Sequence, residues 1–107
     1  MLETANVAIA VYSDSEKTDT YIEDSSIAMT HMLLEAAKLS LGAVWLQIRL
    51  RPSNKEGVSA EAFVNSKLNA PENIKLEALL VLGHIDESPN PQQMPCLPSE
   101  KVHCEQW

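Results

Sequence analysis

The stretch Leu39–Leu50, with the sequence LSLGAVWLQIRL, decides the fold, because it leads from an apolar helix through a glycine into a strand. Successive residues of a strand lie on opposite faces. Over Ala43–Leu50 this alternation gives an aliphatic face (Val44, Leu46, Ile48 and Leu50) and an aromatic and polar face (Trp45, Gln47, Arg49 and Arg51). We expect the aliphatic face to be core. The second face suits either solvent or a polar aromatic ligand.

The helix before this strand has very few polar positions. It is expected to begin near Thr20 or Asp24, which both suit an N-cap, with regular helix from about Asp24 to Leu41. Gly42 follows, where a C-terminal cap glycine is common. Apolar residues cover most of the helix circumference, and they are Ile27, Ala28, Met29, Met32, Leu33, Leu34, Ala36, Ala37, Leu39 and Leu41. Since 107 residues can hardly enclose such a helix, we expect part of it to pack against a second copy in a homodimer.

Two more apolar runs predict strands. All residues of Val7–Tyr12 are apolar or aromatic, so both faces of a strand here would be apolar, which is typical of a strand covered on both sides. Ile74–Leu82 ends as a continuous apolar run, as expected for a central strand, and Gly83 closes it. A short helix between the strands has Ser59 as its cap and stops at 69–71, Asn-Ala-Pro. The order strand, helix, strand, helix, strand would by itself indicate parallel crossover units.

The composition is that of one acidic globular domain. The chain has 45% hydrophobic residues, 8 basic and 15 acidic side chains, and a net charge of −7. Nucleic acid and anionic membranes require clustered Lys and Arg, so we expect neither as a partner. The first residues lack a signal-peptide pattern and no apolar run approaches a membrane span, which predicts a cytoplasmic protein. Cys96 and Cys104 are expected to be free thiols, and the histidines lack metal-ligand spacing, so no metal site is expected.

We expect a single domain over residues 1–107, with a core over 1–85 and an extended tail over 86–107. The tail is rich in proline, with four in the run ESPNPQQMPCLP. A segment this long without structure of its own is either disordered or laid across another surface. Val102 and Trp107 near its end favour the second alternative, in which the tail packs on a partner subunit.

Several short motifs follow one another along the chain. They are an acidic residue opening the Ala-rich helix in EDSSIAMTHMLLEAAKLSLG, the Leu-Gly-x-x-Trp exit into the strand, the Leu-Asn-x-Pro helix stop, the Leu-Gly-His turn and the terminal Lys-Val-His. In this order and spacing they resemble the C-terminal part of the nitroreductase family of flavin oxidoreductases, over nearly all of the chain. The family's N-terminal section, with a basic, serine-containing motif that grips the flavin phosphate, has no counterpart here.

The resemblance implies an α+β fold with three α/β/α layers and an antiparallel (mixed) sheet, truncated at the N-terminus. In that fold Val7–Tyr12 lies beside Ile74–Leu82, and Ala43–Leu50 lies on the other side of Ile74–Leu82. The parallel arrangement would then be wrong. The family also forms intertwined homodimers that hold flavin mononucleotide (FMN) at the interface, which agrees with the burial expected for the apolar helix.

The same resemblance implies a cofactor site on the quoted stretch. A backbone N–H of Gln47 or of its neighbour Ile48 would donate to the flavin N5, while Trp45 and Leu46 would line the ring. Because the family's phosphate motif has no counterpart, the cations that remain for the cofactor phosphate are Arg49, Arg51, Lys55 and Lys101, and of these Arg49 and Lys101 are taken as candidates. No catalytic acid, base or nucleophile is implied, because the cofactor carries the chemistry. Without the resemblance, Trp45 is a packing residue and Arg49 belongs to a solvated strand face.

Two functions are therefore open. The first is an FMN-dependent NAD(P)H oxidoreductase that passes hydride through flavin to a small aromatic acceptor, such as a nitroaromatic compound or a quinone. The second is a truncated relative without catalysis, serving as a dimeric interaction module or a remnant. The wall from Trp45 to Gln47 favours the first, and the missing phosphate motif favours the second. Whether the chain is an enzyme stays open at this point.

Overall fold

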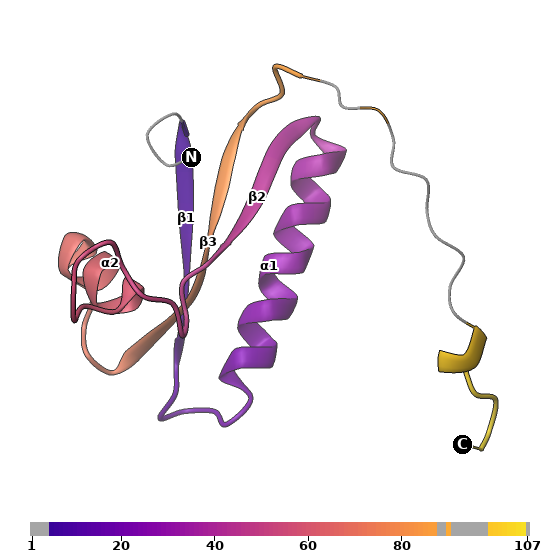
Figure 1. The fold of residues 1–107 in the computed structure, drawn as a ribbon, viewed down its shortest axis with the longest axis horizontal. Helices are drawn as coiled ribbons and strands as arrows, with labels where there is room; N and C mark the ends of the chain where they lie inside the picture. Colours follow the sequence, from indigo (N-terminus) through magenta and orange to yellow (C-terminus); the bar gives the residue numbers. More distant parts are fainter. Residues whose placement is uncertain (1–4, 88–89, 91–98, 107) are drawn as a thin grey trace.

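A computed structural model describes residues 5–87, 90 and 99–106 of the chain. The described part is a three-stranded sheet with two α-helices and a short 3-10 helix near the C-terminus (Figure 1). The elements are β1 (Val7–Asp14), α1 (Tyr21–Lys38), β2 (Leu41–Gln47), α2 (Ala60–Leu68), β3 (Ile74–His84) and η1 (Ser99–Lys101).

The sheet has the strand order β1-β3-β2, with both neighbours antiparallel to the central strand β3. β1 and β2 therefore run in the same direction, joined by α1, and β3 inserts between them. The parallel crossover units that the order of elements indicated are wrong: β3 lies between β1 and β2, and α2 joins two antiparallel neighbours, β2 and β3. The antiparallel α+β fold is confirmed.

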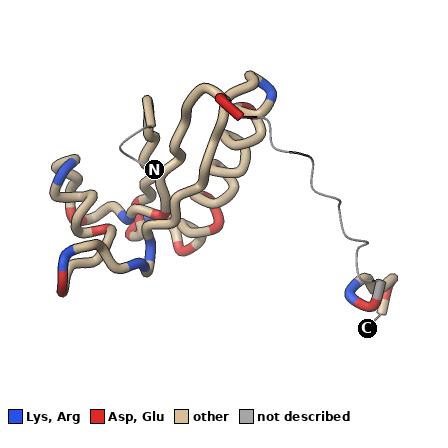
Figure 2. The backbone as a smooth tube through the Cα atoms, turned by 45° about the horizontal axis from the view of Figure 1, so that its top comes forward, with Lys and Arg blue, Asp and Glu red and all other residues tan. Residues whose placement is uncertain are grey.

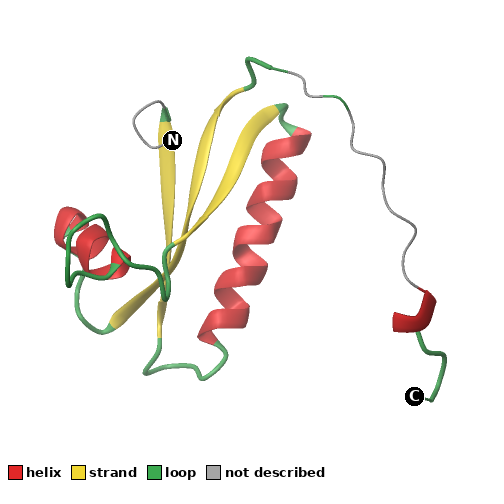
Figure 3. Ribbon diagram, in the orientation of Figure 1, coloured by secondary structure: helices red, strands yellow, loops and turns green. Residues whose placement is uncertain are grey.

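The two helices cover opposite faces of the sheet, which confirms the three layers (Figure 3). On the α1 face, Met29 packs with Ala78 and Leu80, and all three are buried. On the α2 face, Leu76 and Leu79 pack with Ile48 and with half-buried residues of α2. Every residue from Leu76 to Val81 is buried, as expected for a central strand.

β3 carries a bulge at Glu77. Val11 pairs with Ala78 and Tyr12 pairs with Leu76, so Glu77 has no partner on β1. A bulge shifts the alternation of side chains between the two faces. For this reason Leu76 joins the cluster on the α2 face, although Ala78, two residues later, lies under α1.

The end of α1 differs from the expectation. The helix ends at Lys38, and Ser40 adopts the left-handed conformation with φ 58° that a cap glycine would take. Gly42, predicted as that cap, instead lies in β2 opposite Gly83. A Cβ on Gly42 would lie 3.4 Å from the Gly83 carbonyl oxygen, an ordinary contact distance, so neither a turn nor a close approach requires glycine at this position. Of the two expected caps, the structure has Thr20 at the N-cap position, and regular helix begins at Tyr21 rather than at Asp24.

The predicted division of strand Ala43–Leu50 into a core face and a polar face is partly wrong. β2 ends at Gln47, and Leu50, with φ 59°, turns outward and is 85% exposed. Val44 is also exposed, whereas Trp45 packs against the cluster around Met29. Both faces of β2 therefore contribute to the core.

The local signals of α2 are confirmed. The Ser59 hydroxyl accepts a hydrogen bond from the Ala62 backbone N–H at 3.1 Å, as an N-cap does. Asn69 ends the helix in a left-handed conformation. These two residues fix the bounds of α2 without long-range information.

The single chain leaves large apolar side chains uncovered. Ile27 and Leu34, seven residues apart on α1, are more than half exposed, and so is Val7 of β1. The described part of this chain thus encloses neither α1 nor β1 on all sides. The homodimer expected from the sequence stays a prediction.

Residues near the C-terminus give a limited picture of the tail. η1 contacts no other helix or strand among the described residues. Cys104 is an exposed free thiol, whereas Cys96 and Trp107 lie outside the described residues. Within the described ranges, none of the helices has the length and apolar character needed to cross a membrane.

Candidate functional site

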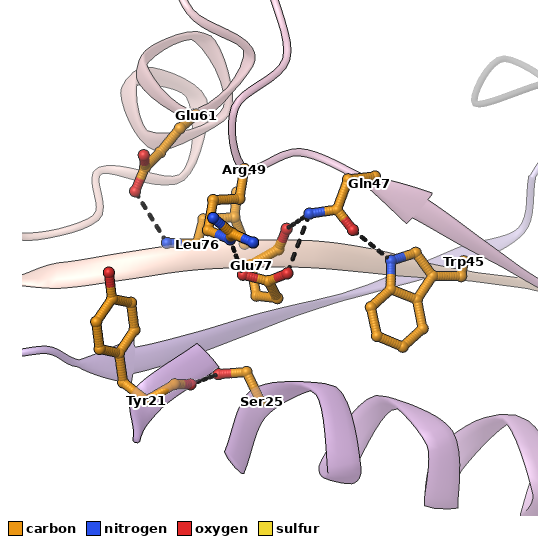
Figure 4. Close-up of polar contacts among 8 residues, drawn as sticks. All are labelled: Tyr21, Ser25, Trp45, Gln47, Arg49, Glu61, Leu76 and Glu77. Atoms are coloured by element: carbon orange, nitrogen blue, oxygen red, sulfur yellow. Dashed lines mark hydrogen bonds and ion pairs between the residues drawn. The ribbon is translucent and has the colours of Figure 1, made fainter. Parts of the chain in front are cut away.

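A line of hydrogen bonds joins two side chains of the region predicted as a cofactor site, Trp45 and Gln47, to Glu77 of β3 (Figure 4). The Trp45 indole Nε1–H donates to Gln47 Oε1 at 2.8 Å. The Gln47 amide Nε2 donates to Glu77 Oε1 at 3.0 Å and to the Glu77 carbonyl oxygen at 3.2 Å. The Gln47 amide therefore has its carbonyl oxygen and both N–H groups engaged within the chain, and only its backbone is left for a ligand.

Glu77 is the centre of this site. Its second carboxylate oxygen, Oε2, accepts from Arg49 Nε at 2.6 Å, and its backbone carbonyl accepts from the N–H groups of Ile48 and Arg49 at 3.3 and 3.0 Å. The side chain is only 6% exposed. Gln47, Ile48 and Arg49 all bind this bulged residue, and the regular pairing of β2 with β3 ends at Gln47.

The directions of their backbone N–H groups show which of the two candidate donors, Gln47 or Ile48, can reach a ligand. In an antiparallel ladder, N–H groups that point to the neighbouring strand alternate with those that point away. The Ile48 N–H is directed at Glu77 in β3. Alternation ends after Ile48, because the next N–H, that of Arg49, also donates to Glu77, but Gln47 still pairs with Ala78 in the regular ladder. The Gln47 N–H therefore points away from β3, and since β2 is an edge strand, it points to the open edge of the described sheet. Gln47 is thus the better donor to a ligand.

Trp45 and Leu46 lie on opposite faces of the sheet. Trp45 is half-buried against the cluster under α1, and Leu46 packs with the cluster of Ile48 and Leu79. Only a ligand at the edge of β2 can touch both residues. The geometry therefore agrees with a ring placed against the edge, next to the Gln47 N–H.

The cationic candidates are not brought together. Arg49 is paired with Glu77, with 31% of its side chain exposed, whereas Lys101 lies on η1 without contact to β2. Figure 2 shows Lys and Arg grouped around α2 and the loop before it. That loop, over 50–59, lines an open hollow of about 610 Å³ with Arg51 and Lys55 at its surface. The Lys55 Nζ lies 5.4 Å from the centre of the Phe63 ring.

The described residues fit the ring of a flavin mononucleotide, but they do not provide a site for its phosphate. A free backbone donor at a sheet edge beside a fixed indole suits a flat ring with hydrogen-bonding edges. The doubly charged phosphate requires several donors or cations, and the described residues do not gather them beside β2. Glu77 is not among the site residues predicted from the sequence, although a lone acidic residue inside the apolar run IKLEALLVL was a usable signal.

Comparison with known proteins points to one family. A model described as the nitroreductase family matches residues 1–84. The whole chain is 31% identical to a protein of Methanothermobacter thermautotrophicus named "Putative NADH dehydrogenase/NAD(P)H nitroreductase", of which it covers 53%. A protein of the same name from Archaeoglobus fulgidus is 29% identical, and the chain covers 61% of it.

Solved structures agree. The chain superposes on an FMN-dependent nitroreductase from Clostridium difficile with a TM-score of 0.89 and 32% identity, covering 99% of this chain and 61% of that one. The chain thus spans between half and two thirds of the length of the proteins that it matches.

Proposed function

Because the chain belongs to the nitroreductase family, we propose that it supplies the ring-binding wall of an FMN site in an NAD(P)H-dependent oxidoreductase. The observation that carries this function is the Gln47 backbone N–H at the open edge of β2, next to an indole that Glu77 and Gln47 hold in place. The names of the similar proteins, one of them FMN-dependent, support the choice of cofactor.

Each residue of the wall has a separate role in this proposal. The Gln47 backbone N–H donates to the reactive edge of the ring, while Trp45 and Leu46 contact it from the two faces of the sheet. Bound flavin would supply hydride transfer from NAD(P)H to a small aromatic acceptor, of the nitroaromatic or quinone type. The side chains of the chain bind and orient, and none of them is required as an acid or base.

The phosphate and the second subunit belong to the same proposal. Arg49 keeps about a third of its side chain at the surface, and Lys101 lies on η1, which contacts no other helix or strand among the described residues. In a homodimer, Arg49 would lie beside the wall of its own chain, while Lys101 would come toward the site of the other copy, with the tail laid across the partner. The exposed Ile27 and Leu34 of α1 would be covered in that dimer. We place this enzyme in the cytoplasm.

A second function is favoured by one observation. The nearest described cation to the wall, Arg49, is paired with Glu77 rather than free for a phosphate. A chain that keeps the fold and the dimer without binding FMN would act as an interaction module.

Anaerobic reduction separates the two functions. The chain is loaded with FMN, unbound cofactor is removed, and NADH or NADPH is added while the visible flavin band is recorded. If the chain is an oxidoreductase, NADH or NADPH bleaches the visible band of the bound flavin. The band returns when a nitroaromatic compound or a quinone is added. A retained flavin whose band neither donor bleaches would contradict the proposed reaction.

A further inference from the structure

We propose that Glu77 is a positioning residue of the flavin site, because its carboxylate and carbonyl oxygens accept from Gln47 and Arg49 and so turn the Gln47 amide oxygen toward Trp45; this role rests on the proposed function. Glu77 would not touch the cofactor. It would act through Gln47, whose backbone carries the donor to the ring and whose side chain holds Trp45.

The direction of the hydrogen bonds follows from the chemistry of the groups. An ionised carboxylate accepts hydrogen bonds and donates none. Both N–H groups of the Gln47 amide are therefore drawn to Glu77, one to its carboxylate and one to its carbonyl oxygen. The amide oxygen must then face the other way, where it accepts from the Trp45 indole at 2.8 Å. The indole cannot reverse this arrangement, because its N–H is only a donor.

The burial of Glu77 makes this arrangement stable. A charge taken out of water needs a partner and hydrogen bonds to remain ionised. The Arg49 Nε supplies the opposite charge at 2.6 Å, and Gln47 supplies a further donor. In the described structure no buried side-chain nitrogen or oxygen is left without a hydrogen bond. Buried networks of this kind, fully satisfied, specify one conformation.

The bulge adds a second constraint on the same strand. The backbone N–H groups of Ile48 and Arg49 both donate to the carbonyl oxygen of Glu77. The end of β2 is thus fixed to a single residue of β3 by main chain and side chain together. The position of the Gln47 N–H at the sheet edge depends on this anchor.

Glu77→Gln replaces one carboxylate oxygen, a hydrogen-bond acceptor, with an NH₂ group, which is a donor. The amide oxygen of the new side chain can still accept from Arg49, but its NH₂ group then faces the NH₂ group of Gln47. Gln47 must turn its oxygen toward residue 77, which leaves its NH₂ group facing the Trp45 N–H. One pair of donors faces another in both of these arrangements. A third arrangement, with the oxygen of residue 77 toward Gln47, would set its NH₂ group against the charged Arg49 Nε–H. Because a charged donor holds the acceptor more strongly than a neutral amide does, we expect the oxygen to stay on Arg49 and the line from Trp45 to residue 77 to break.

The test uses the 107-residue chain with Trp107→Phe, so that Trp45 is the only tryptophan. The fluorescence emission of Trp45 is recorded without flavin, and the dissociation constant for FMN is then measured by titration. The matched control is Glu61→Gln, since Glu61 also binds β3, through the Leu76 N–H at 3.0 Å, but does not belong to the line that ends at Trp45. An amide oxygen can replace the carboxylate in that bond.

We expect Glu77→Gln to shift the Trp45 emission and to weaken FMN binding by about tenfold or more, while Glu61→Gln changes neither. Equal FMN affinities for the two variants would overturn the role of Glu77 and leave the proposed function intact. A loss of affinity without a change of emission would also overturn it. A folded wild-type chain that binds no FMN would remove the proposed function and this role together.

A second variant covers the case in which Glu77→Gln does not fold. Gln47→Ala cuts the line between Trp45 and Glu77 and leaves the ion pair of Glu77 with Arg49 in place. The shifted emission and a weaker FMN affinity are expected again. A Gln47→Ala chain with the emission and the affinity of the wild type would overturn the inference.

Discussion

The Arg49 Nε lies 2.6 Å from the Glu77 carboxylate, in an ion pair that joins the end of β2 to the bulge of β3. Glu77 is buried and Arg49 is about one third exposed. The pair therefore stabilises the fold less by attraction than by preventing an unpaired buried charge.

Arg49→Met removes the cation and leaves the Glu77 carboxylate buried. The free energy of unfolding should fall by about 2–4 kcal/mol, less than for a fully buried pair because water reaches Arg49. Urea denaturation followed by circular dichroism measures the change. Arg51→Met is the matched control, since Arg51 is exposed, and it should stay within about 0.5 kcal/mol of the wild type. Equal effects of the two substitutions would show that the ion pair does not stabilise the fold.

Leu80→Ala should destabilise the protein strongly. Leu80 is 1% exposed in the cluster under α1, and truncation of such a residue costs about 2–5 kcal/mol. Leu50→Ala, at a position that the sequence assigned to the core, should change the free energy of unfolding by less than about 0.5 kcal/mol. A large loss at Leu50 in urea denaturation would contradict the outward turn after β2.

Tyr12 should make the fold sensitive to alkali. Burial, and next the Glu61 carboxylate, raise the pKa of Tyr12 above its ordinary value of 10.0. The folded state holds the proton more tightly than the unfolded state, so this stabilisation is complete below the unfolded pKa and is lost as pH rises through the folded pKa. Tyr12→Phe also removes the hydrogen bond to Asn65 Oδ1 at 2.9 Å.

The measurement compares urea midpoints at about pH 9 and about pH 11. The wild type should lose more stability over this interval than Tyr12→Phe does. Tyr21→Phe, which removes the other tyrosine hydroxyl, should behave as the wild type. An equal loss in wild type and Tyr12→Phe would contradict the alkaline role of Tyr12.

Leu34→Glu should weaken association of two copies. Leu34 is 65% exposed on α1, on the face that also carries Ile27, and a charge there would have to be buried in the proposed dimer. Sedimentation velocity measures the shift from dimer to monomer. Leu68→Glu on α2 adds the same charge at another exposed leucine and should leave the dimer unchanged. A wild type that sediments as a monomer would remove the dimer from the account.

Local chemistry was enough to predict much of the fold. Ser59 and Asn69 mark the ends of α2 by capping and left-handed geometry, which depend on a few neighbouring residues. The central position of Ile74–His84 followed from its apolar run. The arrangement of the strands did not follow, because the pairing of β3 between β1 and β2 is a long-range choice that periodicity does not encode. The family resemblance supplied it.

The candidate site was predicted in part. Trp45, Gln47 and Arg49 share a face by simple alternation, and the structure brings them together. Glu77 lies 28 residues beyond Arg49, and its role depends on a bulge whose position is set by the registers on both sides of β3. The turn at Ser40 was missed because a serine in a left-handed conformation has no signal as clear as that of Gly42.

The most direct test compares FMN retained per chain by wild type, Gln47→Ala and Gln47→Pro after removal of unbound cofactor. Proline lacks the N–H, and the edge of a sheet tolerates it where that N–H points outward. Wild type should retain nearly one FMN, Gln47→Ala less, and Gln47→Pro almost none, while both variants unfold at similar urea concentrations. A folded wild-type chain that retains no FMN, or equal retention by the two variants, would contradict a flavin held by the Gln47 N–H.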